Sequence, residues 1–338
     1  MGKMVRLQRL AGGLITMFLV SAMWVGCASA LDVGESEFYG YTWVRYTYEQ
    51  EEGGEGGNEF TIPRVYLRWK MKLDEKVDAS VTLQMENKQY AQSKYNVTEE
   101  ANESIADWNT VVKYAYVDLK QWPSEGKVRI GLQPIYFGMI DTWNYPLIEG
   151  SLEDKQQVLA AADLGAGVVG LLPAGFGEYA LAVYNGTGYK HIEDNDAKAV
   201  CGSVSIIPAA GVTLRASVYT GKKNEDEEDV KRYAAVAQFV QGDFTGFLEY
   251  LLSEDGDIDG KGYSVFADYS VTEKLAIAGR FDKWDADDSE AGDQIERYIA
   301  GFNYDLAKNV LLQVNYQRED EEAGSGADIW KVQTKFSW

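Results

Sequence analysis

The sequence predicts an all-β protein, a transmembrane antiparallel up-and-down β-barrel of 16 strands. Three observations support this fold class. Many segments alternate between polar and apolar side chains, as strands with two different faces do. Short turns and long polar loops follow one another in strict alternation along the chain. The composition, with 22 Tyr, 9 Trp and 34 Gly but only 6 Pro, suits strands and turns better than helices.

The first 30 residues are predicted to be a cleaved signal peptide. A basic start precedes an apolar run, and an A-x-A cleavage signature ends at Ala30. Lipoprotein processing at Cys27 is an alternative, although Trp24 stands where that signal favours leucine. The remaining chain, 31–338, is predicted to be one barrel domain. It keeps only Cys201, so an internal disulfide is excluded.

The last strand shows the alternation clearly, because Trp330, Val332 and Phe336 are separated by polar residues. An even number of strands with both ends on the short-turn side is what a closed barrel requires. Closure also gives every backbone polar group a partner within lipid. A soluble β-sandwich or solenoid would leave the alternating loop lengths unexplained. We predict strands at 37–49, 59–72, 77–89, 110–121, 127–137, 165–172, 178–186, 197–207, 212–220, 231–241, 244–253, 261–271, 274–284, 294–304, 310–319 and 327–338.

A barrel of this size encloses water, so its polar face should point inward and its apolar face toward lipid. The inward positions are then mostly basic, although the whole chain carries a net charge of −21. That acidic balance argues against nucleic-acid binding. On strand 37–49 the aromatic residues share parity with Arg45, which suggests a bulge or a rim position there. The predicted pore-lining cations are Arg64, Arg68, Lys70, Arg129, Arg215, Arg280, Arg297, Lys331 and Lys335.

The excess negative charge lies in the long loops, such as the acidic, glycine-rich stretch 319–328. Most of each loop is expected to be solvated surface. We also expect these loops to lie near lipopolysaccharide, with divalent cations offsetting their charge.

The loop 138–163 differs, because it is the longest connection and contains Trp143, Tyr145 and Leu147. Apolar side chains need a surface to pack on, and the inside of the barrel would supply one. We therefore expect this third external loop to fold inward and narrow the pore. A short helix is predicted from Ser151 to Ala162, with Ser151 as its N-cap. The acidic residues that this constriction loop contributes are Asp141, Glu149, Glu153 and Asp154.

These features together resemble the outer-membrane porins of Gram-negative bacteria, whose last strand ends in an aromatic residue as this chain ends in Trp338. A narrower resemblance is to the phosphate-selective porin type (O/P), carried by "VRIGLQPIYFG" at 128–138 and by the segment 162–188. The resemblance implies an outer-membrane location, a homotrimer and a third loop that forms the constriction. It also implies that anions, including phosphate-like ones, pass inward arginines and lysines.

We predict a passive diffusion channel for small hydrophilic solutes that prefers anions, because a basic wall concentrates them. The alternative is a phospholipase-like outer-membrane enzyme or an adhesin on the same barrel. No enzymatic activity, cofactor or metal site is predicted. The glycine pattern 165–170 lacks the following helix of a dinucleotide motif. The run 255–260 is similar to the start of a calcium loop, but the twelfth position of such a loop, which needs glutamate, is Phe266. The single histidine, His191, lies in a polar loop without a fixed nucleophile.

Overall fold

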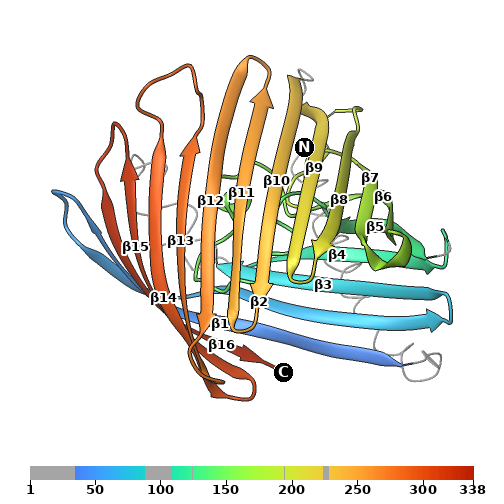
Figure 1. Cartoon of the computed structure of the whole chain (residues 1–338), viewed down its shortest axis with the longest axis horizontal. Helices are drawn as coiled ribbons and strands as arrows, with labels where there is room; N and C mark the ends of the chain where they lie inside the picture. The colour runs from blue at the N-terminus through green and yellow to red at the C-terminus, as the bar shows by residue number, and fades with distance from the viewer. Residues whose placement is uncertain (1–34, 88–107, 124, 194, 224–227) are drawn as a thin grey trace, which may run out of the picture.

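The computed structural model describes residues 35–87, 108–123, 125–193, 195–223 and 228–338, and these form one closed β-barrel (Figure 1). The predicted signal peptide, the alternative site at Cys27 and most of loop 90–109 lie outside the described residues. The strands are β1 (Ser36–Glu51), β2 (Gly57–Asp74), β3 (Val77–Asn87), β4 (Trp108–Lys120), β5 (Gly126–Pro134), β6 (Ala162–Leu171), β7 (Gly177–Tyr184), β8 (Ala199–Ala209), β9 (Val212–Lys223), β10 (Glu228–Gln241), β11 (Phe244–Asp255), β12 (Ile258–Ser270), β13 (Leu275–Asp285), β14 (Ile295–Ala307), β15 (Val310–Glu321) and β16 (Ala327–Ser337).

The prediction of sixteen antiparallel strands is confirmed. Every strand pairs with its neighbours in sequence, and β1 pairs with β16 to close the sheet. The predicted strand ends agree with the structure to within three residues. Some observed strands are longer than predicted, because the backbone hydrogen bonds of a hairpin continue beyond the segment in which polar and apolar side chains alternate. For example, β10 begins at Glu228 inside a stretch that the sequence marks as an acidic loop.

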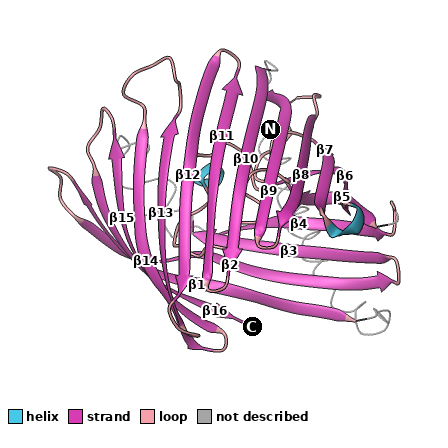
Figure 2. Cartoon of the chain, in the orientation of Figure 1, coloured by secondary structure: helices cyan, strands magenta, loops and turns pink. Residues whose placement is uncertain are grey.

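The two faces of the sheet follow the predicted parity. On β16, Trp330, Val332 and Phe336 are exposed, whereas Lys331 and Gln333 are almost completely buried. The exposed apolar side chains point outward, where a lipid bilayer would cover them. Figure 2 shows how completely strands dominate the barrel wall. The polar face therefore lines the interior.

The ambiguity on β1 is resolved by a bulge in its pairing with β2, between Trp43 and Arg45. The pairing with β16 continues without interruption, so Trp43 lies opposite Lys335 and Arg45 opposite Gln333. Trp43 and Gln333 are both buried on the interior side. The β1 aromatic residues thus share the inner face with charged side chains.

The helix predicted from Ser151 to Ala162 is wrong beyond its first turn. The helix α3 covers only Leu152–Lys155, with the Ser151 Oγ accepting a hydrogen bond from Asp154 N at 3.4 Å. Gln157 then adopts a positive φ of 56°, which a continuing helix does not allow. Among the residues that the structure describes, the other helical element is the short 3₁₀ turn η1 (Pro173–Gly175). Across the described ranges, no helix has the length and apolar character needed to cross a membrane.

Candidate functional site

The connection between β5 and β6, residues 135–161, is here called the crossing segment. It appears in green behind strands β10 to β12 in Figure 1. Its path is held by internal contacts, among them a 2.8 Å hydrogen bond from Trp143 Nε1 to Glu149 O. Its side chains meet residues on the inner face of many strands. The candidate site is therefore the barrel interior and the segment within it.

One set of contacts to the crossing segment is apolar. Trp143 packs edge-on against Phe247 of β11 and Phe266 of β12, with ring centroids 5.8 and 5.5 Å apart. The two phenylalanine rings stack at 5.2 Å, and Leu147 of the segment is fully buried in the same cluster. These phenylalanines occupy inward positions, where a wide barrel would otherwise face water. The interior is apolar here because the segment covers it.

Polar contacts fix the segment to several separate strands of the barrel wall. Arg280 Nη1 of β13 donates to Gly150 O at 2.6 Å, and Asn303 Nδ2 of β14 donates to Pro146 O at 2.8 Å. On β2, five strands from β13 around the barrel, Arg64 Nη1 donates to the hydroxyl of Tyr145 at 2.6 Å. A segment that leaves the wall at β5 and bonds to β13, eight strands away around the sixteen-stranded barrel, crosses the interior.

The acidic residues of the crossing segment are largely occupied by contacts inside the barrel. Asp141 forms an ion pair with Arg215 of β9 at 2.8 Å. Burial raises the pKa of Asp141 to about 6, although Arg215 opposes this shift. Glu149 pairs with Lys331 at 3.1 Å and with Lys155 at 3.7 Å. Burial disfavours its charge, but the two lysines hold the pKa of Glu149 well below its usual range.

The other two predicted acids have different surroundings. Asp154 accepts a hydrogen bond from the Tyr145 hydroxyl at 3.3 Å. Glu153 is fully buried, and its Oε1 accepts from Met139 N at 2.8 Å. Both carboxylate oxygens of Glu249 on β11 are buried close by without a hydrogen-bond partner in the described residues. The four acids therefore do not form one open acidic surface.

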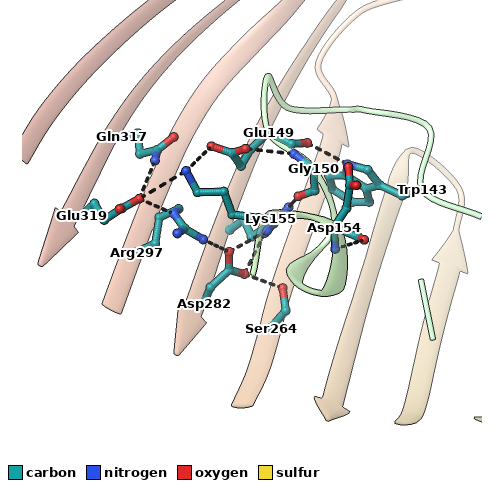
Figure 3. A network of polar contacts seen from close by, with 12 residues as sticks. Trp143, Glu149, Gly150, Asp154, Lys155, Ser264, Asp282, Arg297, Gln317 and Glu319 are labelled. Carbon is teal, nitrogen blue, oxygen red and sulfur yellow. Dashed lines mark hydrogen bonds and ion pairs between the residues drawn. The ribbon is translucent and has the colours of Figure 1, made fainter. Parts of the chain in front are cut away.

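Several wall cations are neutralised in a buried network, which Figure 3 shows. Arg297 bridges Glu319 at 2.8 Å and Asp282 at 3.2 Å. Arg280 also donates two hydrogen bonds to Asp282, at 2.7 and 2.6 Å. Lys155 of the crossing segment reaches Glu319 at 3.7 Å. The network fixes the wall of β13 to β15 beneath the segment.

Arg129 of β5 is neutralised separately. Its guanidinium makes two hydrogen bonds to Asp118, at 2.7 and 2.8 Å, and lies 3.7 Å from the ring centre of Tyr116. The nine predicted cations therefore divide into two groups. Five of them have a carboxylate partner within 4 Å: Arg129, Arg215, Arg280, Arg297 and Lys331.

The remaining four, Arg64, Arg68, Lys70 and Lys335, form no ion pair with any carboxylate in the described residues. They face aromatic rings instead: the guanidinium of Arg68 lies 5.3 Å from Tyr66, and Nζ of Lys335 lies 4.7 Å from Tyr41. Lys70 Nζ lies 5.2 Å from the Tyr39 ring. We call these four cations with Tyr39, Tyr41, Trp43 and Tyr66 the tyrosine–cation bank. It lies on β1, β2 and β16.

Lys113 on β4 is an interior residue that the parity argument missed. A register irregularity between β3 and β4 turns it inward, and its Nζ donates to the Tyr66 hydroxyl at 2.7 Å. A lysine in mid-strand was the available signal, because a charge facing lipid is costly. At the mouth, the connection after β7 reaches β3, where Lys190 pairs with Glu86 at 2.8 Å. Within the described ranges, no group of three or more His, Cys, Asp or Glu side chains could hold a metal ion.

Comparisons with known proteins agree on the fold. The model of a family described as Gram-negative porin matches residues 19–324. No curated protein sequence matches the chain. Similar structures include OmpT, an outer membrane protein of Vibrio cholerae, in its in-vitro folded trimer form. That likeness has 13% identity and a TM-score of 0.63, over 91% of this chain and 100% of that one.

Two further structures are similar at low identity. The anion-selective porin from Comamonas acidovorans is 13% identical with a TM-score of 0.61, over 90% of this chain and 99% of that one. The high-pH structure of OprB from Pseudomonas putida is 10% identical with a TM-score of 0.67, over 93% and 97% of the two chains. At these identities the comparison concerns the barrel architecture.

Proposed function

Because the chain belongs to the Gram-negative porin family, we propose that it is a water-filled outer-membrane channel through which small hydrophilic solutes diffuse passively with a preference for anions. The anion preference is supported by one observation: some cations of the inner wall have a carboxylate partner and others have none among the described residues. Asp141 and Glu149 of the crossing segment already pair with wall cations. Arg68 and Lys70 have no such partner among the described residues.

An ion that leaves bulk water for a narrow lumen feels the charges that are not compensated nearby, and low-dielectric walls strengthen that field. The four unpaired cations therefore attract anions, while each paired cation acts mainly as a short dipole. Small anions such as phosphate would enter this field. The anion-selective porin with the same architecture gives further support. The crossing segment is proposed as the constriction, since it occupies the interior.

Charge reversal tests this assignment. Lys70→Glu should shift the reversal potential of the channel in a KCl gradient toward cation preference. Lys283→Glu is the matched control, because Lys283 lies on the outward face of β13 and pairs with Glu296 at 3.1 Å. It changes the total charge equally but leaves the lumen unchanged. Equal shifts in the two variants would refute a special role for the unpaired wall cations.

We prefer the channel to an enzyme on the same barrel. His191 is exposed in the connection after β7, and its ring makes no hydrogen bond among the described residues. A general base needs a nucleophile held beside it. Stepwise single-channel conductance of the refolded protein supports the channel. A protein without conductance that loses a hydrolytic activity on His191→Ala would establish the enzyme instead. An adhesin would bind its partner but would show no conductance.

We propose further that residues 1–30 are removed on export, that 31–338 forms one barrel domain, and that three barrels associate. The trimer form of the similar OmpT structure supports the assembly. N-terminal sequencing of protein from outer membranes checks the cleavage site, with residue 31 expected first. Light scattering of the detergent complex checks the assembly, and a monomeric mass would contradict it.

The acidic loops are proposed to meet lipopolysaccharide through divalent cations. Lipid phosphates would share the coordination of each ion with loop carboxylates, because divalent cations such as Ca²⁺ and Mg²⁺ take oxygen ligands. A chelator should then lower the melting temperature in native membranes but not in detergent. An equal effect in both environments, or none in either, would contradict the proposal.

A further inference from the structure

Three rings of the tyrosine–cation bank pack in contact, with Trp43 and Tyr66 almost fully buried and Tyr41 partly exposed. Tyr41 lies 5.5 Å from Trp43 and 5.0 Å from Tyr66, measured between ring centroids. The Trp43 ring lies 4.9 Å from the ring of Tyr145, so the packed rings continue to the crossing segment. The strand register places Tyr41 directly opposite Tyr66 on the neighbouring strand. The fold thus builds an uninterrupted row of rings on the inner face.

Each unpaired cation stands beside these rings. The Arg64 guanidinium is surrounded by three of them, 5.0 Å from Trp43, 5.4 Å from Tyr66 and 5.1 Å from Tyr145. Arg68 lies between Tyr66 and Tyr41, and its Nε is buried without a hydrogen-bond partner in the described residues. That N–H is an unused donor between the rings of Tyr66 and Tyr41.

A small hydrated anion gains only the charge attraction here, because the rings offer it few polar contacts and displace its water. An aromatic carboxylate can interact with both the cations and the aromatic rings. Its carboxylate accepts two hydrogen bonds from a guanidinium, which is the strong bidentate geometry. Its ring can lie offset or edge-on to a tyrosine at the 4.5–7 Å spacing that aromatic pairs prefer. The spacing already present in the bank falls within that range.

We propose that the tyrosine–cation bank is a binding track for aromatic carboxylates, and that the channel prefers them to non-aromatic anions of equal charge and similar size. The inference rests on the proposed anion channel and names its substrate class. A ring–ring contact of ordinary strength gives roughly a twofold to tenfold preference.

The test compares benzoate with cyclohexanecarboxylate, which has the same charge and ring size but no π system. Each is added to single channels of the full-length, refolded protein in a planar bilayer. Benzoate should interrupt the chloride current at a concentration roughly twofold to tenfold lower than its saturated analogue. Tyr41→Leu should remove most of this difference, and Tyr41→Phe should keep it because the ring remains. If Tyr41→Leu does not fold, Tyr39→Leu serves in its place.

Equal interruption by the two acids would overturn the inference, as would full discrimination in a correctly folded Tyr41→Leu channel. Inorganic phosphate supplies a third comparison: interruption by phosphate at a lower concentration than benzoate would also overturn it. The proposed function fails in a different way. Absence of conductance, or cation preference in KCl, contradicts the anion channel before any carboxylate is added.

Discussion

Replacing Arg280 with methionine is expected to loosen the crossing segment from the barrel wall. Arg280 is the link between the β13 wall and the segment, since it donates to Gly150 O at 2.6 Å and lies 5.1 Å from the Trp143 ring centre. Methionine keeps much of the side-chain volume but removes both interactions. Asp282 keeps Arg297 and Ser264 as partners, at 3.2 and 2.7 Å.

The magnitude follows from the two lost contacts. A hydrogen bond from a charged donor contributes about 1.5–3 kcal/mol. A desolvated cation–π contact contributes about 2 kcal/mol. Docking of the segment should therefore weaken by roughly 3–5 kcal/mol, which lowers the ratio of docked to released segment by more than about a hundredfold.

Trypsin can report release of the segment, because Lys155 lies within it. Arg280→Met should accelerate cleavage after Lys155 in the refolded barrel and should make single-channel currents noisier. Arg297→Met is the matched control, since Arg297 donates to the same Asp282 and, in the described part of the chain, makes no hydrogen bond to the segment. Protection of Lys155 in Arg280→Met, or equal cleavage in the control, would refute the reasoning.

Two further predictions concern carboxyl groups. The pKa of Asp141, raised to about 6 by burial, makes docking of the crossing segment most favourable when the group is protonated; docking should weaken as pH rises from about 4 to above 6. Asp141→Asn should flatten this dependence of trypsin protection, and an unchanged pH profile would contradict it. Glu249→Gln should raise the melting temperature, because the amide can donate to the buried Glu153 and one buried acid is removed. A lower melting temperature would show that the two carboxyl groups are not in conflict.

The strands could be predicted from the sequence because lipid and water impose a period of two on every one of them. The side chains of β16 illustrate this, since the parity of Lys331 and Trp330 alone places them on opposite faces. The exceptions are bulges. Lys113 escaped the parity argument because one extra residue in β4 turns it inward.

The pairing of the wall cations could not be predicted in the same way. Arg297 and Lys70 are both basic residues at inward positions of their strands. Arg297, however, lies between Asp282 and Glu319, whereas Lys70 faces the ring of Tyr39. The difference depends on the register between strands and on where the crossing segment docks. The inward Phe247 likewise makes sense only once Trp143 covers it. These contacts join residues far apart in sequence, which no local pattern encodes.

The reversal potential of the unmodified channel in a KCl gradient tests the central claim most directly. The unpaired cations Arg64, Arg68, Lys70 and Lys335 predict a potential whose sign shows chloride to be the more permeant ion. The preference should weaken at high salt, where screening shortens the reach of these charges. A potential that shows potassium to be more permeant would contradict the account.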